Sequence, residues 1–421
     1  MSNNNEVILK VENLCQYFKI GDKELKAVDN VSFEIHKGEV FGLVGESGCG
    51  KTTTGRSIIK LYDITSGNVY FKGQRIAAGT RSYTDAIKEK RTEANSKIKE
   101  FNNEIKNDPN KKLELEEKIK AIKEDLNNFV ATQNELIKSA KHDHKNCDKG
   151  YSNREIKVLE EEYLPKLQGL DSSSEEYKSL KKEFNDKKRI LKNTKLVTNI
   201  QMIFQDPIAS LNPRMTVQEI ISEGLIIKGV KDKEYIKKQV YDILETVGLV
   251  KEHATRYPHE FSGGQRQRIG IARSIIMNPD IIIADEPISA LDVSIQAQVI
   301  NLLNELREKL GLTILFIAHD LSVVKYFSDR IGVMYFGKMV ELADADELFA
   351  NPMHPYTKSL LSAIPLPDPN YEKKRQRITY NPLVEHNYEN SKPSFREVRP
   401  NHFVLCNDEE EQKLKETYGN N

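Results

Sequence analysis

The amino-acid sequence predicts an α/β fold with a largely parallel sheet. Short apolar segments at 40–44, 281–284 and 313–318 alternate with segments of helical periodicity. This order is typical of buried parallel strands covered by helices. A charged stretch over 80–197 interrupts the order and has a coiled-coil-like helical spacing of its own. We therefore expect an α/β unit in two sequence parts, joined by a helical insert.

The first part, 1–79, supplies strands and one helix. Alternating apolar residues predict strands at the beginning, and a glycine-rich turn separates the buried strand from a helix. We expect strands over 7–18, 28–35, 40–44 and 67–72, and a helix over 54–61.

The insert, 80–197, is dense in Lys, Glu, Asn and Asp, and its apolar residues recur in steps of three and four. Breaks are expected at 107–110, which contains a proline, and at 141–151. Capping-box patterns begin at Ser152 and Ser173. These signals predict four helices, the third disturbed by Pro165, and a disordered charged spacer is the alternative.

The second part of the unit, 198–350, returns to alternating strands and helices. Past residue 351 the chain is rich in proline and polar residues, so 351–421 is expected to be a poorly regular extension. We expect strands over 200–204, 281–284 and 313–318, and helices within 216–248, from about 264, and over 295–310.

Composition limits the possible partners. Lys+Arg and Asp+Glu are equal at 63 each, so no overall field favours nucleic acid or an anionic membrane. Four cysteines without regular spacing fit a reducing compartment rather than a disulfide framework. No signal segment opens the sequence, and the apolar runs are far shorter than the roughly 20 residues of a membrane span. We expect a soluble, intracellular protein whose membrane role, if any, comes through a partner.

The stretch VFGLVGESGCGKTTT (40–54) carries the spacing G-x-x-x-x-G-K-T. Its glycines leave room for backbone N–H groups to point at a phosphate, Lys51 supplies a positive charge, and Thr52 supplies a hydroxyl for Mg²⁺. Taken alone, the motif also fits a glycine-rich strand-to-helix turn that binds nothing.

Two further segments complete a nucleotide site. The apolar strand in IIIADE (281–286) ends at Asp285, suited to Mg²⁺, and Glu286, suited to accept a proton from water. FSGGQRQR (261–268) is a second glycine turn at a helix start, which favours phosphate binding. His319 follows a strand and is suited to a γ-phosphate, although a strand-end histidine is commonly structural.

In order along the chain, these motifs resemble the full series of an ATP-binding-cassette (ABC) ATPase. The series consists of GESGCGKTT, Gln205 in IQMIFQDP, SGGQRQRIGIAR, IIADEP, SALD and His319. Three longer segments resemble the oligopeptide/dipeptide importers, specifically their F-type ATPase subunit: FQDPIASLNPRMTV (204–217), EPISALDVSIQAQVINLL (286–303) and HPYTKSLLSAIPLPDP (354–369). The resemblance implies a RecA-like parallel-sheet core, an antiparallel β subdomain and a helical signature subdomain.

It also implies a role for each matching residue. Phe18, with Tyr17 as the alternative, would stack on adenine. Gln205 would sense Mg²⁺ and the attacking water, Asp285 would hold the metal with Thr52, Glu286 would act as base, and His319 would grip the γ-phosphate. The residues that would wrap the phosphates are Gly45, Glu46, Ser47, Gly48, Cys49, Gly50, Lys51, Thr52 and Thr53.

The implied assembly is a transporter at the cytoplasmic face of the cell membrane, with this chain as a peripheral subunit using ATP and Mg²⁺. A second, D-type ATPase would form a head-to-tail heterodimer, with two permeases and an external peptide-binding protein. Asp292 would lie across the dimer interface. The residues that would close over the partner's ATP are Ser262, Gly263, Gly264 and Gln265.

Alternatives remain at this point. The same branch also suits another small solute, such as nickel or a modified peptide, because the substrate is chosen by other subunits. A cassette ATPase acting on DNA or the ribosome is a different class. The single cassette, the position of the insert before Gln205 and the segment at 354–369 all favour the importer.

Some features depart from the family pattern. The insert is short in most members, so it is either an arm for a partner or for regulation, or a neutral expansion. Several relatives carry C-terminal cysteines that hold an iron–sulfur cluster, but only Cys406 is present here, so we expect no cluster. A metal-like group, His142, Asp143, His144 and Cys147, is expected to be a solvated loop, and Cys49 is a candidate for sensitivity to thiol reagents.

Overall fold

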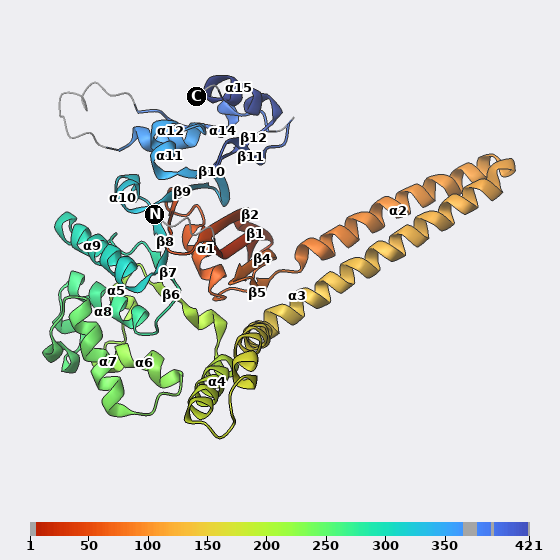
Figure 1. Cartoon of the computed structure of the whole chain (residues 1–421). Coiled ribbons are helices and arrows are strands. Elements are labelled where there is room, and N and C mark those ends of the chain that lie inside the picture. Colours follow the sequence, from red (N-terminus) through yellow and green to blue (C-terminus); the bar gives the residue numbers. More distant parts are fainter. Residues whose placement is uncertain (1–5, 365–376, 389–390, 420–421) are drawn as a thin grey trace.

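Two β-sheets and a projecting pair of helices dominate the structure (Figure 1), a computed structural model that describes residues 6–364, 377–388 and 391–419. The smaller sheet is antiparallel, with the strand order β2-β1-β4-β5. Its strands are β1 (Val7–Ile20), β2 (Lys23–His36), β4 (Ser66–Phe71) and β5 (Gln74–Ala78). The strands predicted over 7–18, 28–35 and 67–72 are therefore confirmed, and β1 and β2 extend further than predicted.

The larger sheet has the order β11-β12-β10-β9-β3-β8-β7-β6. Neighbours among β3, β6, β7, β8 and β9 are parallel, and every residue of β3, β7 and β8 is buried. Continuous apolar sequence therefore marked strands covered on both faces, as predicted. The parallel strands are β3 (Val40–Val44), β6 (Ile200–Ile203), β7 (Ile281–Asp285), β8 (Thr313–Ala318) and β9 (Arg330–Tyr335).

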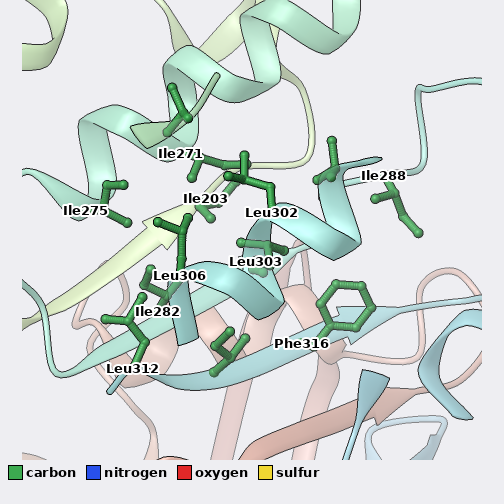
Figure 2. Packing of buried hydrophobic residues seen from close by; sticks show 14 of the residues in the cluster. Ile203, Ile271, Ile275, Ile282, Ile288, Leu302, Leu303, Leu306, Leu312 and Phe316 are labelled. Carbon is green, nitrogen blue, oxygen red and sulfur yellow. The ribbon is translucent and has the colours of Figure 1, made fainter. Parts of the chain in front are cut away.

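Helices α8 (Gly263–Ile275) and α9 (Val293–Leu310) pack their apolar sides on this sheet, as Figure 2 shows. Burying each large aliphatic side chain contributes about 1.5–3 kcal/mol, so this cluster fixes both helices on the strands that end at the candidate site. Its labelled buried members include Ile271 and Ile275 from α8, Leu302, Leu303 and Leu306 from α9, and Ile282 and Phe316 from the sheet.

A helical subdomain precedes α8. It contains α5 (Pro207–Ser210), α6 (Val217–Ile227) and α7 (Lys233–Thr246). A capping box begins α6, in which the Thr216 hydroxyl accepts the backbone N–H of Glu219 and the Glu219 carboxylate accepts that of Thr216. Gly248 has a φ of 74° just after α7, a left-handed conformation typical of the glycine that ends a helix.

The insert forms an arm that extends away from both sheets (Figure 1). Helix α2 (Arg81–Asn107) runs outward, a short turn containing Pro109 reverses the chain, and the first half of α3 (Lys112–Gln168) returns beside it. The break predicted at 107–110 is confirmed. Helix α4 (Glu175–Asn193) then packs on the last part of α3. Among the described residues, no helix is both long and apolar enough to cross a membrane.

The break predicted at 141–151 is confirmed as a kink: Asn146, with φ −116° and ψ 17°, departs from helical geometry, and two helices meet there within α3. With α2 and α4, the two parts of α3 make the four helices predicted for the insert. The segment rests on the smaller sheet: Cys147 and Tyr151 are buried there, and Asp143 forms an ion pair with Arg75 at 2.6 Å. These tertiary contacts outweigh the weak helix propensity of the local sequence.

Other predicted features of the insert need correction. Ser152 lies inside α3 instead of starting a helix, and Pro165 lies in the last turn of α3. The N-cap of α4 is Ser174, not Ser173, and its hydroxyl accepts the N–H of Tyr177. Ser-x-x-Glu patterns also occur by chance, so such a pattern alone does not fix the first residue of a helix.

The prediction of a poorly regular extension is wrong for the described residues beyond 351. Strand β12 (His402–Cys406) pairs with β10 (Lys338–Asp344), and β11 (Ser394–Arg399) pairs with β12, so the extension enlarges the main sheet. His402 and Glu341 are both fully buried and interact at 2.8 Å. The helices of the region are α11 (Ala345–Ala350), α12 (Pro355–Ser362), α14 (Pro382–Glu385) and α15 (Asp408–Tyr418). Residues 365–369 of the segment HPYTKSLLSAIPLPDP lie outside the described residues.

Candidate ATP site

The phosphate loop occupies residues 45–50, between β3 and α1 (Lys51–Ile58). Gly45, Gly48 and Gly50 have φ values of 149°, 81° and 106°, which side-chain-bearing residues rarely adopt. A Cβ atom on Gly45 would lie 2.2 Å from the carbonyl oxygen of Met334, so the loop also passes too close to β9 for any side chain. Helix α1 starts three residues before the predicted 54–61, because Thr54 already donates to the Gly50 carbonyl.

Lys51 is buried, with 3% of its surface exposed, and its ammonium lies inside the loop. Nζ donates to the carbonyl oxygens of Gly45 at 2.7 Å and of Glu46 at 2.9 Å. These two carbonyl oxygens therefore occupy the positions next to the Lys51 ammonium that phosphate oxygens would take. Phosphate oxygens can replace those carbonyls as partners of the ammonium, because they form stronger, charge-assisted hydrogen bonds with it.

Thr52 and Asp285 form the part of the site that fits a divalent cation. The Thr52 hydroxyl donates to Oδ1 of Asp285 at 2.7 Å, and the other carboxylate oxygen, Oδ2, is buried without a hydrogen-bond partner among the described residues. Burial raises the pKa of Asp285, and the hydrogen bond from Thr52 opposes that effect. A buried carboxylate oxygen without a partner is costly, and Mg²⁺ with its bound water would satisfy it.

Glu286 meets two other predicted residues next to this pair. Its Oε2 accepts the Gln205 side-chain N–H at 3.0 Å and lies 3.3 Å from Nδ1 of His319. Gln205 follows β6, Glu286 follows β7, and His319 follows β8, so adjacent parallel strands bring the three residues together at one edge. Glu286 has a φ of 45°, a conformation that costs energy for a residue other than glycine and directs its carboxylate into this group.

The second glycine turn begins α8. The Ser262 hydroxyl accepts the N–H of Gln265 at 3.4 Å, and the Gln265 side chain accepts the N–H of Ser262 at 3.1 Å. The turn packs on the start of α9, where a Cβ on Gly264 would lie 2.6 Å from a methyl carbon of Ile295. Asp292 caps the same helix by accepting the N–H of Ile295. Ser262 and Gly263 are exposed, and no contact of either with the phosphate loop is present among the described residues.

Tyr17 and Phe18 lie near the end of β1, a strand that contacts helix α1 after the phosphate loop. The Tyr17 hydroxyl donates to Asp29 at 2.5 Å, which engages its polar end. Phe18 is half-buried, and its ring contacts Tyr62 edge-on with centroids 5.3 Å apart. Its role toward adenine stays a prediction.

The cysteine and histidine predictions differ in outcome. Cys49 is buried, and burial raises the pKa of its thiol, so the structure gives no support to unusual reactivity. The group His142, Asp143, His144 and Cys147 lies on helix α3 and not in a solvated loop. Among the described residues, no group of three or more side chains is arranged to hold a metal ion through His, Cys, Asp and Glu alone. The absence of an iron–sulfur cluster stays a prediction, and Cys406 is buried in β12.

Sequence reasoning missed Tyr356. This residue of α12 is 1% exposed, and its hydroxyl accepts the backbone N–H of Glu46 in the phosphate loop at 3.0 Å. The two positions are 310 residues apart in the chain. The segment HPYT belongs to the stretch that resembles the oligopeptide/dipeptide importers, but nothing in its local pattern indicates a contact with the phosphate loop.

Comparison with known proteins agrees with this geometry. The family described as ABC transporter matches residues 28–163 and 156–289, and the family described as oligopeptide/dipeptide transporter, C-terminal region, matches 340–397. The oligopeptide transport ATP-binding protein OppF of Bacillus subtilis is 47% identical over 406 residues, 96% of this chain and 98% of that protein. AmiF of Streptococcus pneumoniae, also named as an oligopeptide transport ATP-binding protein, is 42% identical over 407 residues, 96% of this chain and 97% of that protein. The chain therefore belongs to the ABC transporter ATPases, in the family of the oligopeptide transport ATP-binding proteins.

Proposed function

We propose that the chain hydrolyses ATP to power the import of oligopeptides or dipeptides by an ABC transporter. The observation that carries the ATPase proposal is the Thr52–Asp285 pair beside Glu286, with one carboxylate oxygen of Asp285 that has no partner in the part of the chain that the structure describes. The peptide substrate is supported by the names of the relatives and by the C-terminal family match at 340–397.

Each residue of the site has a task in this proposal. Lys51 exchanges its loop carbonyls for β- and γ-phosphate oxygens, while the backbone of the loop surrounds the phosphates. Thr52, Asp285 and Gln205 hold Mg²⁺, which supplies charge neutralisation for the phosphates. Glu286 accepts a proton from the attacking water, and catalysis otherwise consists of positioning and charge stabilisation.

Gln205 and His319 both lie against the carboxylate of Glu286, so they fix the direction from which it can take a proton. His319 is 55% exposed at its side chain and can therefore turn toward a γ-phosphate without breaking buried contacts. Phe18 contributes a half-buried ring for adenine at the end of β1.

A second ATPase subunit completes the site in this proposal. Ser262 and Gly263 are exposed, and Gly264 and Gln265 are half-buried, at the start of α8, where the backbone N–H groups of a helix N-terminus favour an anion. They close over ATP bound to a D-type partner arranged head to tail, and hydrolysis removes the γ-phosphate that joins the two subunits. Two permeases and an external peptide-binding protein place the chain at the cytoplasmic face of the membrane.

The decisive experiment is purification of the tagged chain from membranes, identification of the co-purifying subunits, and transport into proteoliposomes. We expect a second ATPase and two permeases, and ATP-dependent uptake of labelled peptides once the binding protein is added. Uptake of nickel instead of peptides would replace the substrate proposal. A chain that purifies alone from the soluble fraction would contradict the importer.

A further inference from the structure

A tyrosine of the C-terminal extension reaches the phosphate loop. Tyr356 lies in the first turn of α12, almost fully buried, and its hydroxyl accepts the N–H of Glu46 at 3.0 Å. Burial raises the pKa of Tyr356, so the group remains a neutral hydroxyl. A buried tyrosine hydroxyl usually requires a partner, and here that partner belongs to the loop.

The peptide between Gly45 and Glu46 is held on both sides, by Tyr356 and by Lys51. The N–H of Glu46 and the carbonyl of Gly45 belong to one planar peptide and point in opposite directions. Tyr356 binds the N–H, and the ammonium of Lys51 binds the carbonyl at 2.7 Å. Rotation of this peptide would therefore break both hydrogen bonds, so the tyrosine hydroxyl fixes the orientation of the carbonyl that holds Lys51.

Tyr356 is itself held firmly. Its ring contacts Tyr335, which ends β9, with centroids 4.3 Å apart, and Tyr380 at 5.6 Å. Its backbone N–H donates to Nδ1 of His354, the N-cap of α12. These rings and the cap leave the hydroxyl little freedom to move away from the loop.

The anchoring continues into the main sheet. Glu341 of β10, fully buried, accepts the backbone N–H groups of Met353 and His354 at 2.7 and 3.0 Å. The same carboxylate contacts His402 of β12 at 2.8 Å. A continuous set of buried polar contacts therefore leads from the added strand β12 through the start of α12 to the phosphate loop.

We propose that Tyr356 is a positioning residue for ATP binding: it fixes the Gly45–Glu46 peptide in the geometry of the phosphate loop, so that the C-terminal extension sets the affinity of the loop for ATP. The proposal rests on the proposed function only in taking ATP as the ligand of the loop. It gives the extension a direct part in the nucleotide site instead of a role confined to stability.

The test is Tyr356→Phe in the full chain, which keeps the ring and its packing but removes the acceptor for the Glu46 N–H. Loss of one hydrogen bond of ordinary net strength corresponds to about a fivefold change in an equilibrium constant. We expect the Kd for ATP, measured by equilibrium dialysis with labelled ATP and Mg²⁺, to rise about fivefold. The KM for ATP in the assembled ATPase should rise similarly, with a much smaller change in kcat.

Tyr388→Phe is the matched control. The Tyr388 hydroxyl donates to the carbonyl of Leu405 at 3.2 Å, so this variant also removes a tyrosine hydrogen bond within the extension, but one that does not involve the loop. Its Kd and KM should equal those of the wild type. An equal rise in both variants would overturn the proposal, because general loosening of the extension would then be the cause.

Thermal unfolding separates positioning from a purely structural role. A lower melting temperature of Tyr356→Phe with unchanged Kd and KM would also overturn the proposal. The comparison of Kd values stands independently of transport. A wild-type chain that binds ATP but drives no peptide uptake would therefore contradict the importer proposal and leave this inference intact.

Discussion

Lowering the pH should destabilise the C-terminal extension through His354. This side chain is 1% exposed and caps α12 by accepting the N–H of Tyr356 on Nδ1 at 3.1 Å, a bond that requires an unprotonated nitrogen. Burial, followed by the nearby charges of His386 and Lys358, lowers the pKa of His354 to about 3. The ring also contacts Tyr380, and it lies 5.2 Å from the ring of His386.

Proton binding determines the sign and the size of this change in the free energy of unfolding. In the unfolded chain a histidine has a pKa of about 6.5, so between that value and about 3 the unfolded state binds a proton that the native state does not. Stability is therefore present above about pH 6.5 and is lost as the pH falls. At about 1.4 kcal/mol per pH unit, moving from pH 7.5 to 5.0 should cost about 2 kcal/mol from this residue.

The assay is urea unfolding of the wild type and of His354→Asn at both pH values, followed by far-UV circular dichroism. Asparagine keeps an oxygen able to cap the helix but does not titrate. The wild type should lose about 2 kcal/mol more than His354→Asn on acidification. His142→Asn, at an exposed histidine of the arm, serves as control and should behave like the wild type. Equal pH dependence in the wild type and His354→Asn would refute the reasoning.

Three further outcomes can be measured. Glu286→Gln should bind ATP normally but release phosphate at least about a hundredfold more slowly, equivalent to about 3 kcal/mol of transition-state stabilisation. Near-normal turnover of this variant would contradict the assignment of Glu286 as the base. Asp143→Asn should lower the free energy of unfolding in urea by about 1–2 kcal/mol, because Arg75 loses a charged partner at the base of the arm. Glu93→Gln is the control: Glu93 pairs with Lys97 on the exposed surface of the arm, so this variant should leave the free energy of unfolding nearly unchanged. All four cysteines are buried, so a thiol reagent should modify them slowly in the native chain and fully in guanidinium; rapid labelling of Cys49 with loss of ATPase activity would contradict this.

Much of the site could be predicted because its signals are local. The glycine spacing in 45–50 requires a particular backbone, and that backbone is what the structure contains. Asp285 ends a buried strand and Glu286 follows it, and Gln205 and His319 follow the two neighbouring strands. Parallel neighbouring strands end at the same edge, so their last residues meet without any further information.

The parts that were predicted wrongly depend on contacts between distant segments. The break predicted in 141–151 is limited to a kink at Asn146, and Ser152 starts no helix, because Cys147 and Tyr151 are buried against the smaller sheet. The extension beyond 351 is ordered by a buried His402–Glu341 pair, which hydrophobic periodicity cannot reveal. Tyr356 in turn meets a loop 310 residues earlier. Patterns of apolar residues describe local periodicity, and none of these contacts is local.

The position of the arm has a consequence for how the chain folds. The backbone N–H of Gly38 donates a hydrogen bond to the hydroxyl of Thr313, 275 residues away in the sequence. The main sheet can therefore close only after most of the chain has been synthesised. Doubling a closed loop adds only about 0.6 kcal/mol of entropic cost, so even an unstructured insert would scarcely hinder this closure. The α2–α3 contacts are by contrast close in sequence near the reversal at Pro109, and such contacts form quickly. The helices of the arm can therefore form on the ribosome before Thr52 and Asp285 come together.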